Sequence, residues 1–206
     1  MRCLNEPIAR WANREDNCTG RFWEGRFKSQ ALLDERALVS CMAYVDLNPI
    51  RACMADRPET SDYTSIQERL GIEPAISTDA QLPHHDDDKR EPLKLAELLP
   101  FAGNEHITNK PQHIPFDLME YIQLVDWTGR AIRENKRGAI SENLPSILDR
   151  LGIAPDEWLK TCCHIERNFG RAIGPAAKIT ELCDKLGQRW MHGLKNCRRF
   201  YAQQTV

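Results

Sequence analysis

The stretch DERALVSCMAYVDLNP, residues 34–49, decides how the first part of this chain folds. Residues 35–48 hold no proline or glycine, and Asp34 stands where the N-cap of a helix is preferred. Three apolar side chains recur at helical spacing and predict one apolar face: Leu38, Met42 and Val45. Pro49 predicts the end of the helix. The pattern therefore indicates a half-buried helix over residues 35–48.

A short aromatic segment, RFWEGRFKS at residues 21–29, precedes this helix. Its aromatic side chains, Phe22, Trp23 and Phe27, favour a strand. The predicted order in this part of the chain is therefore a strand, a short loop, a helix and a proline-terminated turn.

Tyr44 and Asn48 are the residues of the predicted helix that could carry chemistry. They are four residues apart, so their side chains lie on one helical face. A tyrosine hydroxyl can attack phosphorus, and an amide oxygen beside it can bind a metal that neutralises the developing charge. The alternative is a packing tyrosine whose hydroxyl is satisfied by a neighbour.

The composition divides the chain into three predicted regions: residues 1–57, 58–115 and 116–206. The middle region carries most of the prolines and the run PHHDDDKR at 83–90, which predicts an acidic linker with some local helix. The last region is predicted to be helical, and its short helices with Gly and Pro joints resemble a helix-turn-helix bundle. The predicted helices are 116–135, 146–151, 155–169 and 176–190.

Charge is unevenly distributed, although the formal net charge is only −2. Residues 160–206 contain nine Lys or Arg against three Asp or Glu, whereas residues 73–126 contain eleven acidic against four basic residues. The basic C-terminal block favours contact with nucleic-acid phosphates. The alternative is a set of solvated helix faces.

Neither a membrane span nor an N-terminal signal sequence is visible. No apolar run approaches the roughly 18 residues that a span requires, so we expect a cytoplasmic protein without a membrane partner. The eight cysteines form no C-x-x-C pair, so small buried side chains are favoured over a zinc site.

Two motifs resemble those of HUH-type tyrosine transposases, which include the REP-associated and single-strand insertion-sequence enzymes. The string YVDLNPIRA at 44–52 is similar to the family signature Tyr-x-x-x-Asn-Pro-x-[Arg/Lys]-Ala. GRFWEGRFKS at 20–29 resembles the strand that precedes the tyrosine helix, and DYTS at 62–65 resembles a weaker downstream motif. The resemblance covers roughly residues 5–65, less than a third of the chain.

The resemblance implies DNA transposition through a phosphotyrosine link, with Tyr44 as the nucleophile. It also implies that Asn48 helps two histidines of a His-hydrophobic-His strand to hold Mg²⁺ or Mn²⁺. Arg26, Lys28 and Arg51 would then contact the backbone of single-stranded or hairpin DNA, the alternative being ordinary surface charge. Because family members often pair through their sheets, a homodimer is a further implication.

The sequence departs from the family at the metal site, because no histidine precedes His84 and no His-x-His occurs. We therefore expect an N-terminally truncated transposase that is inactive alone and does not bind the Mg²⁺ or Mn²⁺ of the family by itself. The fold class we expect is α+β, a remnant of a ferredoxin-like transposase domain (strand then tyrosine helix) followed by a mainly α-helical C-terminal region. The alternative function is a non-catalytic DNA-binding or interaction module.

Overall fold

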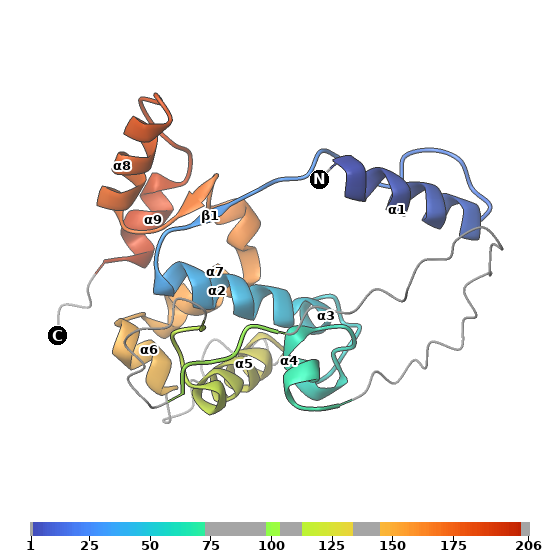
Figure 1. Ribbon diagram of the computed structural model, residues 1–206. Helices are drawn as coiled ribbons and strands as arrows, with labels where there is room; N and C mark the ends of the chain where they lie inside the picture. Colours follow the sequence, from blue (N-terminus) through green and yellow to red (C-terminus); the bar gives the residue numbers. More distant parts are fainter. Residues whose placement is uncertain (1, 73–97, 104–112, 134–144, 203–206) are drawn as a thin grey trace.

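The computed structural model describes residues 2–72, 98–103, 113–133 and 145–202, and shows a mainly helical protein with two very short parallel strands (Figure 1). In chain order its elements are α1 (Arg2–Glu15), β1 (Ala31–Leu32), α2 (Glu35–Asp46), α3 (Asn48–Arg51), η1 (Pro58–Thr60), α4 (Ser65–Arg69), α5 (Leu118–Arg133), α6 (Ser146–Leu151), α7 (Pro155–Asn168), β2 (Ala172–Ile173), α8 (Ala176–Lys185) and α9 (Leu194–Phe200). None of the helices within the described residues has both the length and the hydrophobicity that crossing a bilayer demands.

Helix α2 begins where the sequence predicts. The Asp34 carboxylate accepts a 2.9 Å hydrogen bond from the backbone N–H of Ala37, which caps the first turn. The predicted end at Asn48 is wrong, because α2 stops at Asp46 and a separate short helix, α3, starts at Asn48. Pro49 lies in the first turn of α3 and has no N–H to donate, so α2 cannot continue through it.

The predicted apolar face of α2 is confirmed only in part, because Leu38 and Met42 pack against the core and Val45 does not. Leu38 and Met42 are only partly buried, and Val45 is 55% exposed. The side chains that α2 buries are mostly small, namely Ala37, Val39, Ser40, Ala43 and Asp46. Helix α2 packs most extensively on α7, and small side chains allow two helix backbones to approach closely. The most deeply buried side chains of α2 are therefore smaller than those of its predicted apolar face, which packs on the core through Leu38 and Met42.

The predicted strand at residues 21–29 does not form. These residues adopt bends and irregular backbone, and Phe22, Trp23 and Phe27 are 41–57% exposed. A strand needs a partner to satisfy its backbone groups, and none of the described residues pairs with this segment. Pairing begins only at β1, where Ala31 lies opposite Ala172 of β2.

The two parallel strands join the start of α2 to the C-terminal half of the chain. Besides the strand register, the backbone N–H of Leu33 donates to the carbonyl of Ile173 at 2.9 Å. The Gln30 side-chain amide donates to the carbonyl of Gly170 at 2.6 Å. Residues 31–47 and the C-terminal helices consequently share one hydrophobic core.

Four of the C-terminal helices begin at or near the predicted positions, but α8 ends at Lys185 instead of residue 190, and α9 was not predicted. Helix α6 matches its prediction at both ends, and α7 begins with Pro155 in its first turn as expected. Helices α5 and α8 lie within the predicted ranges 116–135 and 176–190. The described part of the expected linker contains η1 and α4, whereas its acidic run at 83–90 lies outside the described residues. The division of the chain near residues 57 and 115 stays a prediction.

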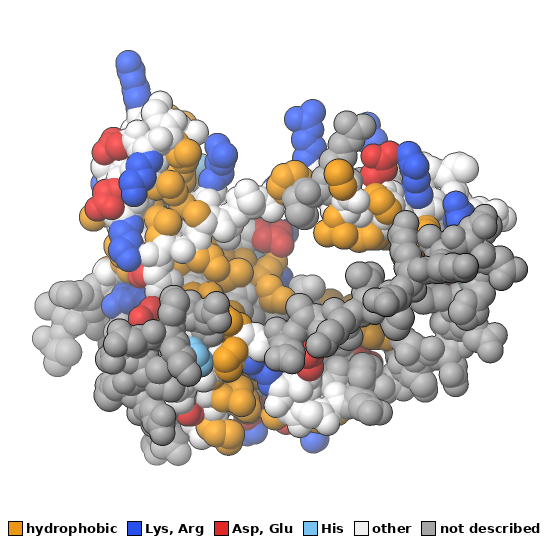
Figure 2. All heavy atoms as spheres, viewed as in Figure 1, with side chains coloured by type: hydrophobic (Ala, Val, Ile, Leu, Met, Phe, Trp, Pro, Cys, Tyr) orange, Lys and Arg blue, Asp and Glu red, His pale blue; other side chains and the backbone are white. Residues whose placement is uncertain are grey.

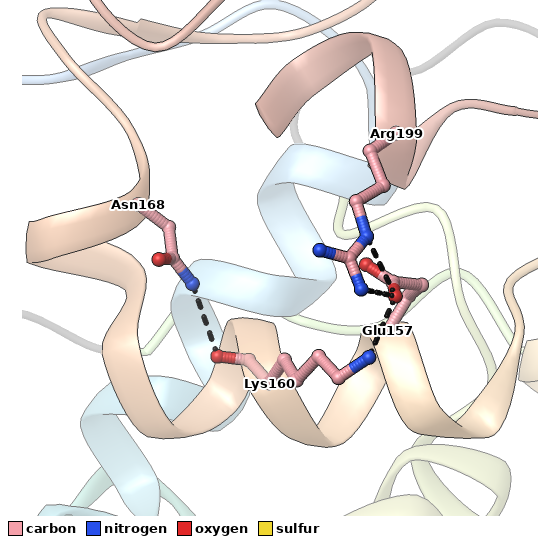
Figure 3. Close-up of polar contacts among 4 residues, drawn as sticks. All are labelled: Glu157, Lys160, Asn168 and Arg199. Carbon is pink, nitrogen blue, oxygen red and sulfur yellow. Dashed lines mark hydrogen bonds and ion pairs between the residues drawn. The ribbon is translucent and has the colours of Figure 1, made fainter. Parts of the chain in front are cut away.

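A polar cluster fixes α9 on α7 (Figure 3). One carboxylate oxygen of Glu157 accepts hydrogen bonds from Lys160 Nζ at 2.9 Å and from Arg199 Nη2 at 2.7 Å. Asn168, at the end of α7, donates to the carbonyl of Lys160 at 3.2 Å. Phe200 of α9 is buried beneath this cluster's helices.

Helix α1 stands apart from the helical body, to which residues 16–30 connect it (Figure 1). Hydrophobic side chains gather on α1 in the space-filling view (Figure 2), and Leu4, Ile8 and Trp11 are exposed. A hydrogen bond from Trp23 Nε1 to the carbonyl of Asn5 ties the following segment to the helix. Within the described part of the chain, no residue before Ala31 belongs to the core.

Candidate functional site

Tyr44, Asn48 and Arg51 lie together at one pocket of about 440 Å³. Tyr44 comes from the last turn of α2, and the other two residues are the first and last of α3. The rest of the lining comes mainly from α7. It consists of Ala52, Ile132, Cys163, His164, Glu166 and Arg167.

Local sequence explains why the three N-terminal residues meet. Their spacing of four and three residues keeps them on one side of the chain even though the helix breaks at Leu47, whose backbone has φ −87° and ψ 0°. Leu47 and Ile50 point into the core on the other side. Burial of these two residues turns the polar side chains toward the pocket.

The Tyr44 hydroxyl donates a 2.7 Å hydrogen bond to Oε1 of Glu166 on α7. The guanidinium carbon of Arg51 lies 4.1 Å from the centroid of the Tyr44 ring, which is a cation–π contact. The phenol is therefore held at two points, through its oxygen and through its ring face.

Burial raises the pKa of Tyr44, and its hydrogen bond to Glu166 raises it further. The positive charge of Arg51 acts in the opposite direction without reversing the shift. Tyr44 is consequently protonated at neutral pH, since even the unperturbed phenol has a pKa near about 10.

Helix α7 bends at the pocket, because His164 has non-helical backbone angles of φ −141° and ψ 34°. Burial raises the pKa of the neighbouring Cys163 thiol, which disfavours a reactive thiolate.

The Arg167 side chain is exposed and makes no hydrogen bond or ion pair with any described residue. The buried Nη1 of Arg51 likewise lacks a hydrogen-bond partner in the part of the chain that the structure describes.

Two of the predicted DNA contacts lie elsewhere. Arg26 and Lys28 are exposed on the irregular segment before β1 and do not line the pocket.

The sequence did not predict Glu166 and Arg167 as residues of the site. They are 122 and 123 positions beyond Tyr44, and no local pattern links such distant residues. Their spacing from Cys163 does place all three on one helical face.

The divalent metal that the resemblance implies for the family does not fit the described residues around Asn48. Mg²⁺ and Mn²⁺ take several oxygen ligands, and the pocket offers the Asn48 amide together with the Glu166 carboxylate, which already holds Tyr44. Within residues 2–72, 98–103, 113–133 and 145–202, no three His, Cys, Asp or Glu side chains converge as a metal site would require. His84 and His85 lie outside the described residues.

A second pocket of about 400 Å³ lies between η1 and α5, and its charges are largely neutralised. Arg130 pairs with Asp126 at 2.6 Å, and Arg133 pairs with Asp56 at 3.3 Å. The Tyr44 pocket differs in that its two arginines have no carboxylate ion pair within the described residues.

Comparison of the chain with protein-family models, with curated proteins and with solved structures finds no significant match.

Proposed function

We propose that this protein binds single-stranded or hairpin DNA, and that the Tyr44 pocket receives a backbone phosphate. The observation that carries the proposal is the pair of arginines, Arg51 and Arg167, beside the Tyr44 hydroxyl in one pocket. The transposase resemblance of residues 20–29 and 44–52 supports DNA as the source of that phosphate.

The pocket has the chemistry that a phosphodiester requires. Arginine presents several N–H donors in a planar fork that matches phosphate oxygens. The Arg51 side chain lines the pocket, and Arg167 would gain the counter-charge that it lacks among the described residues. Against these two cations stands one carboxylate at the pocket, Glu166, so the site favours an anion.

Tyr44 occupies the position of the family's nucleophile, and we propose that it contacts the bound phosphate. DNA binding without strand cleavage is the proposed activity of the chain by itself. Tyr44 is protonated at neutral pH, and the described residues supply too few ligands for a metal that would help it to attack. We also propose, from the resemblance, that residues 20–48 are the remnant of a ferredoxin-like transposase domain, although residues 21–29 do not form the strand expected of it. A homodimer stays a prediction.

Equilibrium binding to a fluorescent DNA hairpin with a single-stranded tail, measured at several salt concentrations, tests the function. We expect Arg167→Ala to weaken binding and to reduce the slope of log affinity against log salt by about 1, as expected for one lost phosphate contact. Arg189→Ala removes an equal charge from an exposed site that is not in the pocket. It should change affinity much less.

The basic C-terminal helices give a second candidate surface for non-catalytic DNA binding. Lys and Arg side chains lie over α8 in Figure 2, and Lys185, Arg189 and Arg198 are exposed. If Arg189→Ala weakens binding as much as Arg167→Ala does, this surface carries the binding instead of the pocket. If the wild-type chain shows no salt-dependent binding at all, the DNA-binding proposal is wrong.

A further inference from the structure

We propose that Glu166 is the positioning residue of Tyr44, so that α7 determines where the phenol oxygen points in the pocket. The geometry consists of the 2.7 Å hydrogen bond from the hydroxyl to Oε1 of Glu166 and the stacking of Arg51 on the ring. The inference rests on the proposed function, because the direction of the hydroxyl matters only if the pocket receives a phosphate.

The two contacts together leave the phenol little freedom. Arg51 restrains the face of the ring, and Glu166 restrains its oxygen, so rotation of the side chain must break at least one contact. A tyrosine near the end of a helix would otherwise turn its hydroxyl to water, because that polar end gains from hydration. The hydroxyl instead bonds to a side chain of a different helix.

The part of α7 around Glu166 is anchored in the core, while the Glu166 side chain itself is exposed. Cys162 and Ile165, on either side of the bend at His164, are buried in the core. One turn earlier, the buried Trp158 donates its indole N–H to Thr128 at 2.8 Å. A site residue on such an anchored helix keeps its position more accurately than one on a loop.

The contact has an electrostatic consequence for binding. The Glu166 carboxylate repels an incoming phosphate, while Arg51 and Arg167 attract it. Among the described residues, the other titratable side chains that line the pocket are Cys163 and His164. Burial raises the pKa of Cys163, so its thiol adds no negative charge at neutral pH. A phosphate that accepts the Tyr44 hydroxyl must first take it from Glu166. Removing the charge of Glu166 should therefore raise affinity for DNA, by about two- to fivefold for a partly exposed charge.

The direct test is the ionisation of residue 44 in the full chain. A fluorinated tyrosine placed at position 44 reports its own titration by ¹⁹F NMR. We expect Glu166→Gln to lower the pKa of this phenol, because the carboxylate and its hydrogen bond raise it in the wild type. Glu181→Gln, at an exposed position on α8 away from the pocket, is the matched control and should leave the titration unchanged.

Glu166→Asp keeps the charge but shortens the side chain, so it separates the hydrogen bond from the charge. In Glu166→Asp we expect the phenol of residue 44 to have a pKa between its values in the wild type and in Glu166→Gln. If Glu166→Gln folds, as judged by its circular dichroism, and the titration of residue 44 does not move, the positioning role is wrong.

The outcomes for Glu166 and for DNA binding are independent. A shifted titration without any DNA binding by the wild type would support the positioning role and overturn the proposed function. DNA binding that Arg167→Ala weakens, combined with an unchanged titration of residue 44, would support the proposed function and overturn the positioning role of Glu166.

Discussion

The hydroxyl of Tyr121 donates a 2.6 Å hydrogen bond to Oδ2 of Asp46, and both side chains are buried. The other carboxylate oxygen accepts the Ser65 hydroxyl at 2.8 Å and the backbone N–H of Ile66 at 3.3 Å. Burial, followed by the charge of Asp46, raises the pKa of Tyr121, which keeps this donor protonated. One carboxylate therefore joins α2, α4 and α5 two residues beyond Tyr44.

Replacing this carboxylate should destabilise the protein strongly. We expect Asp46→Ala to lower the free energy of unfolding by about 2–4 kcal/mol, because it leaves buried donors on Tyr121 and Ile66 without an acceptor. Urea unfolding followed by circular dichroism measures the change. Asp149→Ala, at an exposed position in α6, is the control and should change stability by less than about 0.5 kcal/mol. Similar midpoints for the two variants would contradict the importance of the cluster.

The close approach of two backbone segments at Gly193 leads to a second prediction. Gly193 has φ +94°, and a Cβ added there would lie 2.6 Å from the backbone nitrogen of Gly170. Gly193→Ala should therefore cost about 3 kcal/mol, from left-handed backbone strain plus the steric clash. Gly187 has φ +63° with open space around it, so Gly187→Ala isolates the strain and should cost about 1 kcal/mol. Equal losses in thermal or urea unfolding would show that the close approach is absent.

The cluster of Glu157, Lys160 and Arg199 predicts how the stability of the protein depends on pH. Burial raises the pKa of Glu157, but its contacts with Lys160 and Arg199 outweigh burial and hold the pKa below its usual value. The pKa in the folded chain is thus below that in the unfolded chain. The resulting stability is present above about pH 4.3, the unfolded value for Glu, and is lost as pH falls through the folded value.

Urea unfolding of wild type and Glu157→Gln between about pH 6 and pH 3 measures this effect. We expect a stability difference below about 1 kcal/mol at pH 6, because Arg199 and Lys160 are more than half exposed, and this difference should shrink toward pH 3. A difference that is constant with pH, or that grows on acidification, would contradict the assigned sign.

The chain by itself should form no covalent link to DNA. We expect no protein–DNA band in a denaturing gel after incubation with hairpin DNA and Mn²⁺, because Tyr44 is protonated and the described ligands around Asn48 are too few. A band that forms with the wild type and disappears in Tyr44→Phe would overturn this prediction. Tyr44→Phe should still bind DNA, about two- to tenfold more weakly than the wild type, because it loses one hydrogen bond to the phosphate.

Local sequence determined the elements that depend on contacts between residues close together in the chain. The capping aspartate at 34 and the first turn of α7 at Pro155 depend on neighbours within four residues, and both are found where predicted. The same reasoning placed Tyr44 and Asn48 on one side of the chain, which survives the break at Leu47 because helical spacing is nearly preserved across it.

Tertiary structure alone decided the rest, because the decisive contacts join residues far apart in the chain. The aromatic segment at 21–29 has strand propensity but finds no partner among the described residues, so it stays irregular. Helix α2 buries mostly small side chains and packs most extensively on α7, a contact that its own sequence does not reveal. The chemistry around Tyr44 likewise depends on Glu166 and Arg167, which only the packing of α7 against α2 brings to the pocket.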